Sequence, residues 1–521
     1  MRLICLALLV AGCEKSDGGF VDDLPETTTT EDTPGTERYD PTHLTEVKAT
    51  FAGSEWDDLR QESRLFYEII TGEDCLTEPI PNVFNWHPGE VEIDGERLEN
   101  VGFRKKGLIG SMSWTRPSLK VDADRFEDKQ EFADGTEHFT FNNNQQDPSR
   151  VHTCMAYYVF RKAGVPAPLC SFATMDVDGV DLGVYTNVQP IKKAFLRQNF
   201  GNDDGDLYEG TASDVSDAYL ATFDIKSDGS SLAPLEALRD ALLLEDDALI
   251  EALVEIVALD EFITEWAVEG LIGHWDGYAN GTNNFYVYNN PADGKLHFIP
   301  WGTDSVLEDA SSDPLFTNGQ LVQRLWNHPD GQAMYLAEAA RLLDEVWDEE
   351  ELLAEIDRIE ALISPHFLDP AETSASIDSA RDFVDDRRST YQATIDAPPD
   401  RPYLPSERYC YEIIGSVTGT FDIAWGSLDD DPFENPSTLS GDVNGAPMHN
   451  FSVGGIAGVD TYDGSKIVAI FGVDEPYENL TEIAIVIPDG IGVGTYPVDL
   501  AAVVGYVVEG SLIYPYEEWE I

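Results

Sequence analysis

Apolar and polar residues alternate in the first part of the chain and recur with helical spacing in a later part. The alternation predicts strands, and the dipeptide Asp178-Gly179 between two of them predicts a two-residue hairpin turn. A helix is expected over Arg150–Ala163, because its apolar residues follow the helical period and Gly164 is a stop signal. The expected strands are Val91–Val101, Phe103–Lys106, Ser118–Asp122, Phe172–Val177 and Leu182–Val188.

Helical periodicity dominates after Asp214. A strand-rich segment that precedes a helix-rich one is typical of an α+β fold rather than of a doubly wound sheet. We assign both segments to one domain over residues 46–397. The predicted helices are Leu232–Leu244, Asp247–Leu259, Asp260–His274, Gly331–Val346, Glu349–Ile363 and Thr373–Thr394.

The pattern changes again near Pro405. Short apolar runs such as Lys466–Gly472, Glu482–Ile487 and Val503–Val508 are separated by turn residues. This pattern predicts a small all-β sandwich over residues 405–521. The length of 521 residues, with 42% hydrophobic and 11% aromatic residues, agrees with two or three globular domains.

The overall charge excludes one class of partner. The chain has 32 Lys and Arg residues against 98 Asp and Glu residues, which gives a net charge of −66 at pH 7. Such an acidic surface repels phosphate backbones, so we expect no nucleic-acid partner.

The first residues predict export. Residues 1–13 contain the apolar run Leu3–Val10 and are typical of a signal peptide. Their end, Val10-Ala11-Gly12-Cys13, resembles a bacterial lipobox, which implies that Cys13 carries a lipid anchor. Glu14 follows instead of Asp, which favours the outer membrane, on its periplasmic side or at the cell surface. An ordinary signal peptide with an incidental cysteine is the alternative.

Residues 14–45 are acidic, rich in Thr and poor in apolar residues, and they predict a disordered tether. Beyond the tether, the even number of cysteines suits disulfides in an oxidising compartment. Three pairings are possible, buried free thiols are an alternative, and no spacing fits a zinc site. The cysteines are Cys75, Cys154, Cys170 and Cys410.

Two aspartates are predicted to converge. Strands are expected before and after the turn Asn290–Gly294, so the start of the first strand lies beside the end of the second. Asp276 precedes this hairpin and Asp304 follows it, with Asn284 near both. Two acids and an amide at one point make an oxygen-rich site suited to Mg²⁺ and phosphate. The alternative is that both acids occupy ordinary turns.

A second group of residues is basic in an otherwise acidic chain. Gly107, Gly110 and Ser111 form a loop between two strands, and glycines let backbone N–H groups approach a phosphate. This pattern predicts an anion-binding patch, and a basic hairpin that offsets acidic neighbours is the alternative. The basic residues are Arg104, Lys105, Lys106, Arg116 and Lys120.

Several motifs, in order over roughly 350 residues, resemble the spore-coat protein H (CotH) kinase family. They span the basic loop, the two aspartates and the segments between them. The C-terminal β region is not covered by the resemblance. The motifs are Arg104-x-Lys106-Gly107 with Ser111 and Lys120, Phe141-Asn142-Asn143 with Asp147 and Ser149, Asp181-Leu182-Gly183-Val184-Tyr185, Asp206-Leu207-Tyr208, Trp275-Asp276-Gly277-Tyr278 with Asn284-Phe285-Tyr286, and Ile299-Pro300-Trp301-Gly302-Thr303-Asp304.

The resemblance implies an atypical protein-kinase-like fold, with a strand-rich N-lobe and a helix-rich C-lobe, that transfers the γ-phosphoryl group of ATP to Ser or Thr of a protein with Mg²⁺ or Mn²⁺. It implies that Lys120 binds nucleotide phosphates, that Asp276 is the catalytic-loop acid, and that Asp304 and Asn284 bind metal, with Asp276 beside them. The implied cofactor-binding residues are Arg104, Lys106, Gly107, Ser111, Lys120 and Gln189.

The chain departs from the family pattern at several points. Gln189 stands where Glu is expected, and Glu209 stands where Lys is common. The helix Arg150–Ala163 contains no Glu to pair with Lys120, so a pairing acid must come from elsewhere. Asn284 lies eight residues after Asp276, and its possible substitutes are Asn280 and Asn283.

Three functions are compatible with the sequence. The first is a surface-tethered kinase of an extracytoplasmic protein. The second is a non-catalytic binding or adhesion lipoprotein that retains the fold. The third is nucleotidyl transfer, in which the α-phosphate is attacked instead of the γ-phosphate.

Overall fold

The computed structural model describes residues 36–62, 75–108, 111–227 and 229–404, with Ser406, Gly426 and the strands of the C-terminal region. The predicted signal peptide, its Cys13 and the tether up to residue 35 lie outside the described residues. Residues 36–45, expected to belong to the tether, are part of the fold. Tyr39 is buried, and Arg38 pairs with Glu96 at 2.7 Å and Asp134 at 2.5 Å.

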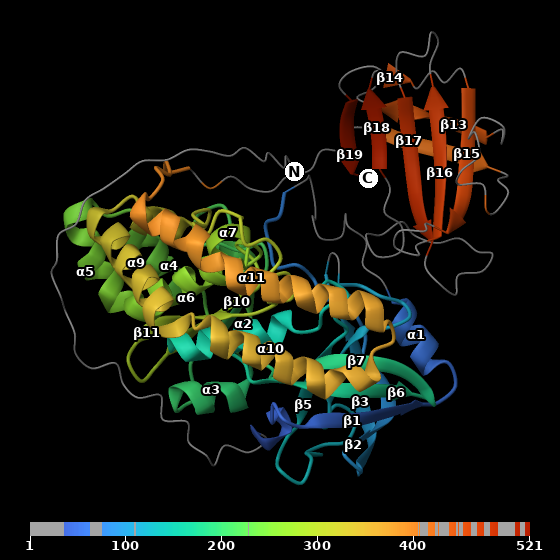
Figure 1. Ribbon diagram of the computed structural model, residues 1–521, viewed down its shortest axis with the longest axis horizontal. Helices are drawn as coiled ribbons and strands as arrows, with labels where there is room; N and C mark the ends of the chain where they lie inside the picture. Colours follow the sequence, from blue (N-terminus) through green and yellow to red (C-terminus); the bar gives the residue numbers. More distant parts are fainter. Residues whose placement is uncertain are drawn as a thin grey trace.

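The strand-rich part is a closed seven-stranded barrel in the order β1-β2-β3-β4-β5-β7-β6 (Figure 1). Neighbouring strands are antiparallel except β1 and β6, which run parallel. Phe103, Leu119 and Phe141 belong to the buried cluster of the barrel, so the alternate residues of their strands face outward. The strands are β1 (Leu44–Phe51), β2 (His87–Ile93), β3 (Glu96–Lys106), β4 (Ser118–Asp122), β5 (His138–Asn142), β6 (Cys170–Val177) and β7 (Val180–Val188).

The predicted strands of the barrel are largely confirmed. The hairpin around Asp178-Gly179 and the strand Ser118–Asp122 are present. The single strand predicted over Val91–Val101 is wrong, because Asp94 and Gly95 have positive φ values of 50° and 83° and form a turn. The parallel pairing of β1 with β6 was not predicted, since it joins segments far apart in the sequence.

The helix-rich part is built around a four-stranded sheet in the order β11-β10-β8-β9. The predicted hairpin is confirmed as β10 and β11. The strands are β8 (Asp206–Gly210), β9 (Asp224–Ile225), β10 (Phe285–Asn290) and β11 (Lys295–Pro300). Together with the barrel, this arrangement confirms the α+β fold class.

The predicted helices are present with shifted ends, and that over Glu349–Ile363 has the predicted bounds. The helices α1, α3, α7 and α8 were not predicted, because their sequences are short. The helices are α1 (Glu55–Gln61), α2 (His152–Ala163), α3 (Lys193–Phe200), α4 (Ala233–Leu242), α5 (Asp246–Ile256), α6 (Leu259–Ile272), α7 (Tyr278–Gly281), α8 (Gln320–Trp326), α9 (Pro329–Arg341), α10 (Glu349–Ile363) and α11 (Pro370–Asp396).

The long helix α11 crosses from the barrel to the helical part (Figure 1). Near its first turn, Thr373 accepts a hydrogen bond from Arg150 at 2.7 Å. Near its end, the hydroxyl of Tyr391 donates to the carbonyl of Ala267 in α6 at 2.7 Å. In the described part of the chain, no helix combines the length and apolar character needed to span a bilayer.

A disulfide joins Cys154 in α2 to Cys170 at the start of β6. Cys75 is also disulfide-bonded, and Cys410 lies outside the described residues. One of the pairs that the sequence left open is thereby assigned.

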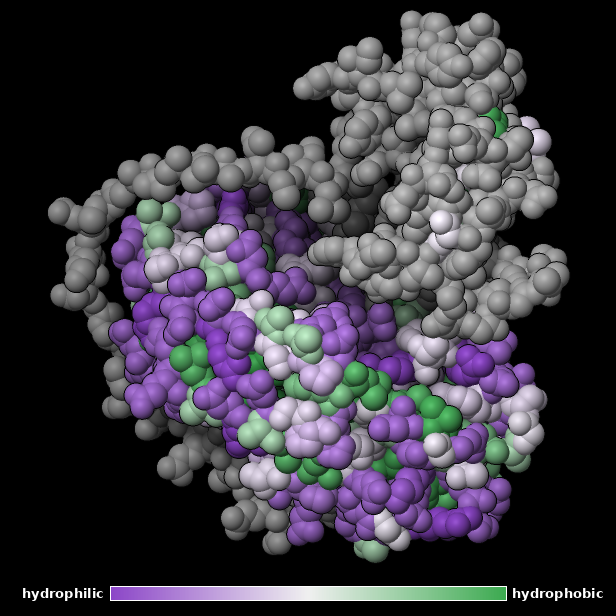
Figure 2. Space-filling model, turned by 45° about the vertical axis from the view of Figure 1, so that its right-hand side comes forward, coloured by the Kyte–Doolittle hydropathy of each residue, from purple (hydrophilic) through white to green (hydrophobic). Residues whose placement is uncertain are grey.

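The described strands of the C-terminal region form two antiparallel sheets, β12-β13-β14 and β15-β16-β17-β18-β19. They agree with the predicted all-β character, whereas a sandwich packing over residues 405–521 stays a prediction. Where side chains are coloured, the surface is mainly hydrophilic (Figure 2), as the charge suggests. The strands are β12 (Gly415–Phe421), β13 (Ser437–Val443), β14 (Ala446–Pro447), β15 (Ser452–Val459), β16 (Lys466–Val473), β17 (Leu480–Ile487), β18 (Tyr506–Gly510) and β19 (Tyr516–Glu520).

Candidate active site

The two aspartates singled out in the sequence meet at the open end of the β10–β11 hairpin. At this end, the backbone amide of Trp301 donates to the carbonyl of Asn284 at 3.0 Å and holds the two strands together. The Asn284 side chain donates to the Asp276 carboxylate at 2.6 Å. Asp304 follows β11 at the same end, and its charge acts on Asp276. The structure therefore brings these acids and Asn284 together, as the hairpin geometry predicts.

Burial perturbs both carboxylates, and the charge of Asp304 adds to the effect on Asp276. The pKa of Asp276 is raised to about 6, chiefly by burial and further by the negative charge of Asp304, while the amides of Asn283 and Asn284 oppose the rise. Burial also raises the pKa of Asp304, and the ammonium of Lys106 opposes that shift. Two acids this close favour a shared cation.

The oxygen atoms at this point suit a hard divalent cation. Asn283 donates its amide N–H to both oxygens of Asp276 at 3.2 Å. Its own Oδ1 is buried without a hydrogen-bond partner. Across the described residues, no group of three or more His, Cys, Asp or Glu side chains could hold a metal ion. The set that fits is therefore a mixed one of two carboxylates and asparagine amide oxygens.

The asparagines near Asp276 differ in their contacts. Asn283 and Asn284 both bind it, as described above. Asn280, a possible substitute in the sequence, donates to the carbonyl of Trp275 at 2.7 Å and accepts from Asn318 at 2.9 Å. Asn280 therefore holds the loop together.

The backbone of the site adopts conformations that few residues tolerate. Thr282 and Asn284 have positive φ values of 48° and 50°. Gly302 has a φ of 55°, and a Cβ atom there would lie 2.4 Å from the Asn284 side chain. Such conformations persist only where surrounding contacts impose them, and they are frequent at functional sites. Gly302 thus leaves the space that Asn284 occupies.

Glu269 of α6 fixes the loop that carries Asp276. Its carboxylate accepts hydrogen bonds from the backbone amides of Tyr278 and Ala279 at 2.9 and 2.8 Å. Gly277 leaves room for it, since a Cβ there would lie 2.3 Å from Glu269 Oε1. Burial raises the pKa of Glu269 to about 8. The sequence analysis missed this residue, although an acid within a helix as apolar as α6 is a usable signal.

Glu265, one turn before Glu269, predicts a pH-dependent stability. Both of its carboxylate oxygens are buried without a hydrogen-bond partner. Its pKa is raised well above the ordinary value by burial and by the charges of Glu269 and Glu261. The native state therefore keeps a proton that the unfolded state releases above about pH 4.5, so stability falls as the pH rises from there.

We expect Glu265→Gln to raise the free energy of unfolding at pH 8 by several kcal/mol, because the wild type loses about 1.4 kcal/mol per pH unit above the unfolded-state pKa and the amide has no proton to lose. At pH 4 the variant and the wild type should be nearly equal, because the wild-type carboxyl is then protonated in both states. Urea unfolding at the two pH values measures this difference. A gain of the same size at pH 4 would contradict the explanation.

Two histidines hold the loops around the aspartates. The buried His274 donates through Nε2 to the carbonyl of Trp301 at 3.2 Å. Burial lowers its pKa to about 4, so it is neutral at pH 7. His152 donates through Nδ1 to the carbonyl of Asp304 at 2.9 Å. The Asp147 carboxylate accepts from the His152 amide at 2.9 Å and so stabilises the start of α2.

The basic residues Arg104, Lys106 and Lys120 form a cationic cluster on the outer face of β3 and β4. Arg104 and Lys120 are Cα partners, and Lys106 lies two residues along the same strand. Lys106 donates to Asn142 and lies 5.8 Å from the ring centre of Trp301. Within the described part of the chain, Arg104 and Lys120 form no ion pair closer than 4.0 Å.

The cationic cluster and the acids belong to one site. Burial lowers the pKa of Lys120 to about 8, Glu209 opposes this shift, and Lys106 and Arg104 add to it. Burial also lowers the pKa of Lys106, and the negative charge of Asp304 opposes this shift most strongly. Partly desolvated cations beside two acids are the kind of groups that a metal–phosphate site combines.

The loop after β3 is shaped by Gly107 and Ser111. Gly107 has a φ of 138°, and a Cβ there would lie 2.9 Å from Ser111 Oγ. The Leu108 amide donates to Ser111 Oγ at 3.2 Å. The side chain of Asn143 donates to the carbonyls of Ser111 and Arg116 at 3.1 and 2.7 Å. Asn143 therefore holds the middle of this loop and its end before β4, while Gly110 lies outside the described residues.

Other predicted site residues are engaged elsewhere. Gln189 accepts from the Leu169 amide at 3.1 Å and donates to Gln198 at 2.8 Å. Arg116 donates to the carbonyl of Val184 at 2.9 Å. Among the described residues, these side chains are therefore hydrogen-bonded away from the cationic cluster.

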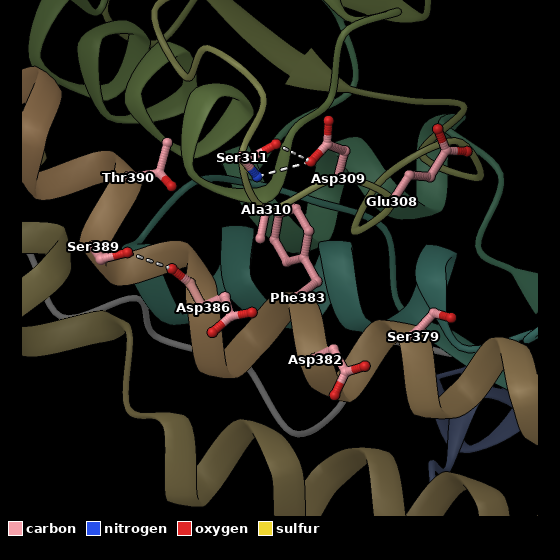
Figure 3. Close-up of a pocket in the computed structure, with 10 residues that line it drawn as sticks. All are labelled: Glu308, Asp309, Ala310, Ser311, Ser379, Asp382, Phe383, Asp386, Ser389 and Thr390. Carbon is pink, nitrogen blue, oxygen red and sulfur yellow. Dashed lines mark hydrogen bonds between the residues drawn. The ribbon is translucent and has the colours of Figure 1, made fainter.

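An acidic groove of about 510 Å³ lies between the loop after Asp304 and helix α11 (Figure 3). Phe383 points from α11 toward Ala310, and the acids surround this contact. The charge of Asp304 acts on Glu308 at the rim, which places the groove next to the aspartates. Its lining is Glu308, Asp309, Ala310, Ser311, Ser379, Asp382, Phe383, Asp386, Ser389 and Thr390.

Comparisons with known proteins match this region of the chain. The family model described as CotH kinase protein matches residues 103–396, from the cationic cluster to the end of α11. The chain is 26% identical over 291 residues to an inner spore coat protein H-like protein of Bacillus subtilis (strain 168), an alignment that covers 54% of this chain and 85% of the relative.

Proposed function

The chain belongs to the CotH kinase protein family, and from this membership we propose that it transfers the γ-phosphoryl group of ATP to Ser or Thr hydroxyls of an extracytoplasmic protein. The observation that carries the proposal is the convergence of Asp276, Asn284 and Asp304 opposite the cationic cluster. Phosphoryl transfer needs little covalent chemistry from the protein, because positioning and charge neutralisation supply most of the catalysis. The site contains the groups for both.

The metal and the phosphates divide between the two halves of the site. Asp304, Asn284 and Asp276 would hold Mg²⁺ or Mn²⁺, which would neutralise charge on the transferring phosphoryl group. Lys120, Lys106 and Arg104 bind the phosphate oxygens. Gly107 and Ser111 shape the backbone loop that approaches them.

Asp276 is proposed as the general base that accepts the proton of the attacking hydroxyl. Its raised pKa of about 6 is close to neutral pH, where a general base works well. The amides of Asn283 and Asn284 hold the carboxylate in place. Glu269 acts through the loop as a positioning residue.

The acceptor protein is proposed to carry basic residues near the phosphorylated hydroxyl. The acidic groove begins at Glu308, four residues after Asp304 in the sequence, and is also lined by Asp309, Asp382 and Asp386. The net charge of −66 attracts basic segments and repels acidic ones over longer distances.

The place of action is proposed to be the cell envelope, with the chain anchored through Cys13 to the outer membrane. The lipobox-like residues before Cys13 support this location, and so does the disulfide between Cys154 and Cys170, because disulfides persist in oxidising compartments.

Transfer of label from ATP tests the proposed reaction. The chain is incubated with Mg²⁺ or Mn²⁺ and a basic Ser- and Thr-containing acceptor protein, with ATP labelled on the γ- or the α-phosphate. Label from the γ-phosphate on Ser or Thr supports a kinase. Label from the α-phosphate indicates nucleotidyl transfer, and the absence of ATP binding and of transfer leaves a binding or adhesion protein.

A further inference from the structure

Glu209 lies between basic residues from two separate sheets. It belongs to β8, and its Oε2 is 2.5 Å from the Nζ of Lys226, just beyond β9. The charge of Glu209 also acts on Lys120 of the barrel. It raises the pKa of this lysine, which burial lowers. In return, Lys226 and Lys120 counter the effect of burial on Glu209 and leave its pKa below the ordinary value. One carboxylate therefore faces a lysine from each part of the fold.

Further contacts hold this carboxylate. Glu209 and Tyr286 are Cα partners in the β8–β10 pair, and the Tyr286 hydroxyl helps to lower the pKa of Glu209. The ring of Tyr286 packs edge-on against Trp301 at 5.8 Å between centres. Trp301 in turn borders Lys106. Glu209 is thereby tied to the hairpin end that carries Asp304.

The second lysine is also oriented. Asp224 binds Lys226 from the side of β9, and Lys226 keeps a third of its side-chain surface exposed. Lys226 is therefore held by the carboxylates of Glu209 and Asp224, and one side of it is still exposed to solvent. Such a cation can bind a further anion without losing its own support.

The helix that could have supplied a partner for Lys120 does not do so. Helix α2 has the sequence HTCMAYYVFRKA, with no acidic residue. Without an acid, the ammonium groups of Lys120, Lys106 and Lys226 would repel one another, and burial would favour the neutral form of Lys120. Glu209 is the acid that the structure places against this repulsion.

We propose that Glu209 positions Lys120 and Lys226 as a two-sided clamp for the nucleotide phosphates, in which Lys226 is a phosphate-binding residue. This inference rests on the proposed ATP site. Lys120 approaches the phosphates from the barrel and Lys226 from the four-stranded sheet, so that bound nucleotide joins the two parts of the fold. Glu209 pairs directly with Lys226, acts on Lys120 through its charge, and leaves the phosphates to the two lysines.

Removal of the Glu209 charge tests whether Glu209 positions the lysines or only lies near them. An acid that merely lies near an anion site weakens anion binding, so its loss would strengthen binding. For a positioning acid we expect the opposite: Glu209→Gln weakens binding of ATP and of inorganic tripolyphosphate about tenfold, because the lysines separate and Lys120 loses charge. Isothermal titration calorimetry of the full chain at pH 7.5 and fixed salt measures both ligands. Unchanged or tighter binding overturns the proposal.

Substitution of Lys226 tests the clamp independently of Glu209. Lys226→Met should weaken tripolyphosphate about tenfold and leave adenosine binding unchanged, whereas Lys226→Arg should stay within about twofold of the wild type. Lys48→Met is the matched control, because Lys48 pairs with Glu46 and Glu92 on the barrel surface, and it should bind both ligands normally.

The outcomes distinguish the two proposals. If the wild type binds neither ATP nor tripolyphosphate, the proposed function fails and the clamp fails with it. If the wild type binds both ligands and Lys226→Met binds them as tightly, the clamp alone is wrong. A Lys226→Arg variant that melts like the wild type but binds no better than Lys226→Met also overturns it, since the charge would then be irrelevant.

Discussion

Asp304→Asn is expected to lower the rate of phosphoryl transfer at saturating ATP by at least about 1,000-fold. The substitution removes the negative charge that would hold the metal next to the cationic cluster. It keeps the size of the side chain, and the backbone contact survives because the carbonyl of Asp304, not its carboxylate, accepts the hydrogen bond from His152. Burial raises the pKa of Asp304, so the neutral amide should leave the protein at least as stable as the wild type.

Single-turnover transfer from γ-labelled ATP measures the effect, and thermal unfolding verifies the fold. Asp293→Asn is the matched control: Asp293 lies in the turn at the closed end of the same hairpin, where it accepts from the Lys295 amide at 3.0 Å, and its loss should leave the rate unchanged. A variant at Asp304 that retains a tenth of the wild-type rate would contradict the assigned role. Loss of rate together with early melting would show damage to the fold instead.

The hairpin site could be predicted from the sequence because its geometry is local. A turn of fixed length places the residues before one strand beside those after the next, so Asp276 and Asp304 had to lie at the same end. The basic residues Arg104 and Lys120 were found for another reason, since they stand out in an acidic chain on either side of a glycine-containing loop.

The supporting residues could not be predicted in this way. Glu269 reaches Asp276 through a helix and a loop, and Glu209 reaches Lys120 across two separate sheets. These contacts depend on how distant segments pack, and no periodicity along the chain encodes such packing. The closure of the barrel through parallel β1 and β6 is of the same kind. The departure at Glu209 was visible in the sequence, but its meaning required the position of Lys226.

Arg387 is the buried residue whose loss should destabilise the protein most. Its side chain has no exposed surface, and burial lowers its pKa to about 10, so it remains charged at pH 7. The guanidinium donates to the carbonyls of Leu271 at 3.0 Å and Gly270 at 2.5 Å, at the end of α6. It also donates to the carbonyls of Ala310 at 3.0 Å and Ser312 at 2.7 Å, in the loop after Asp304.

Arg387→Met should lower the free energy of unfolding by about 3–5 kcal/mol, because two buried and two partly buried carbonyls lose their donor while the methionine fills part of the space. Urea unfolding measures the change. Arg381→Met on the same helix is the control: Arg381 pairs with Asp357, Glu360 and Asp378 near the surface, and its loss should cost about 1 kcal/mol. Equal effects of the two substitutions would show that the buried carbonyls find other partners. With unequal effects, the loop after Asp304 should loosen first, because Arg387 joins that loop to the end of α6. Transfer activity should then fall at urea concentrations below the unfolding transition.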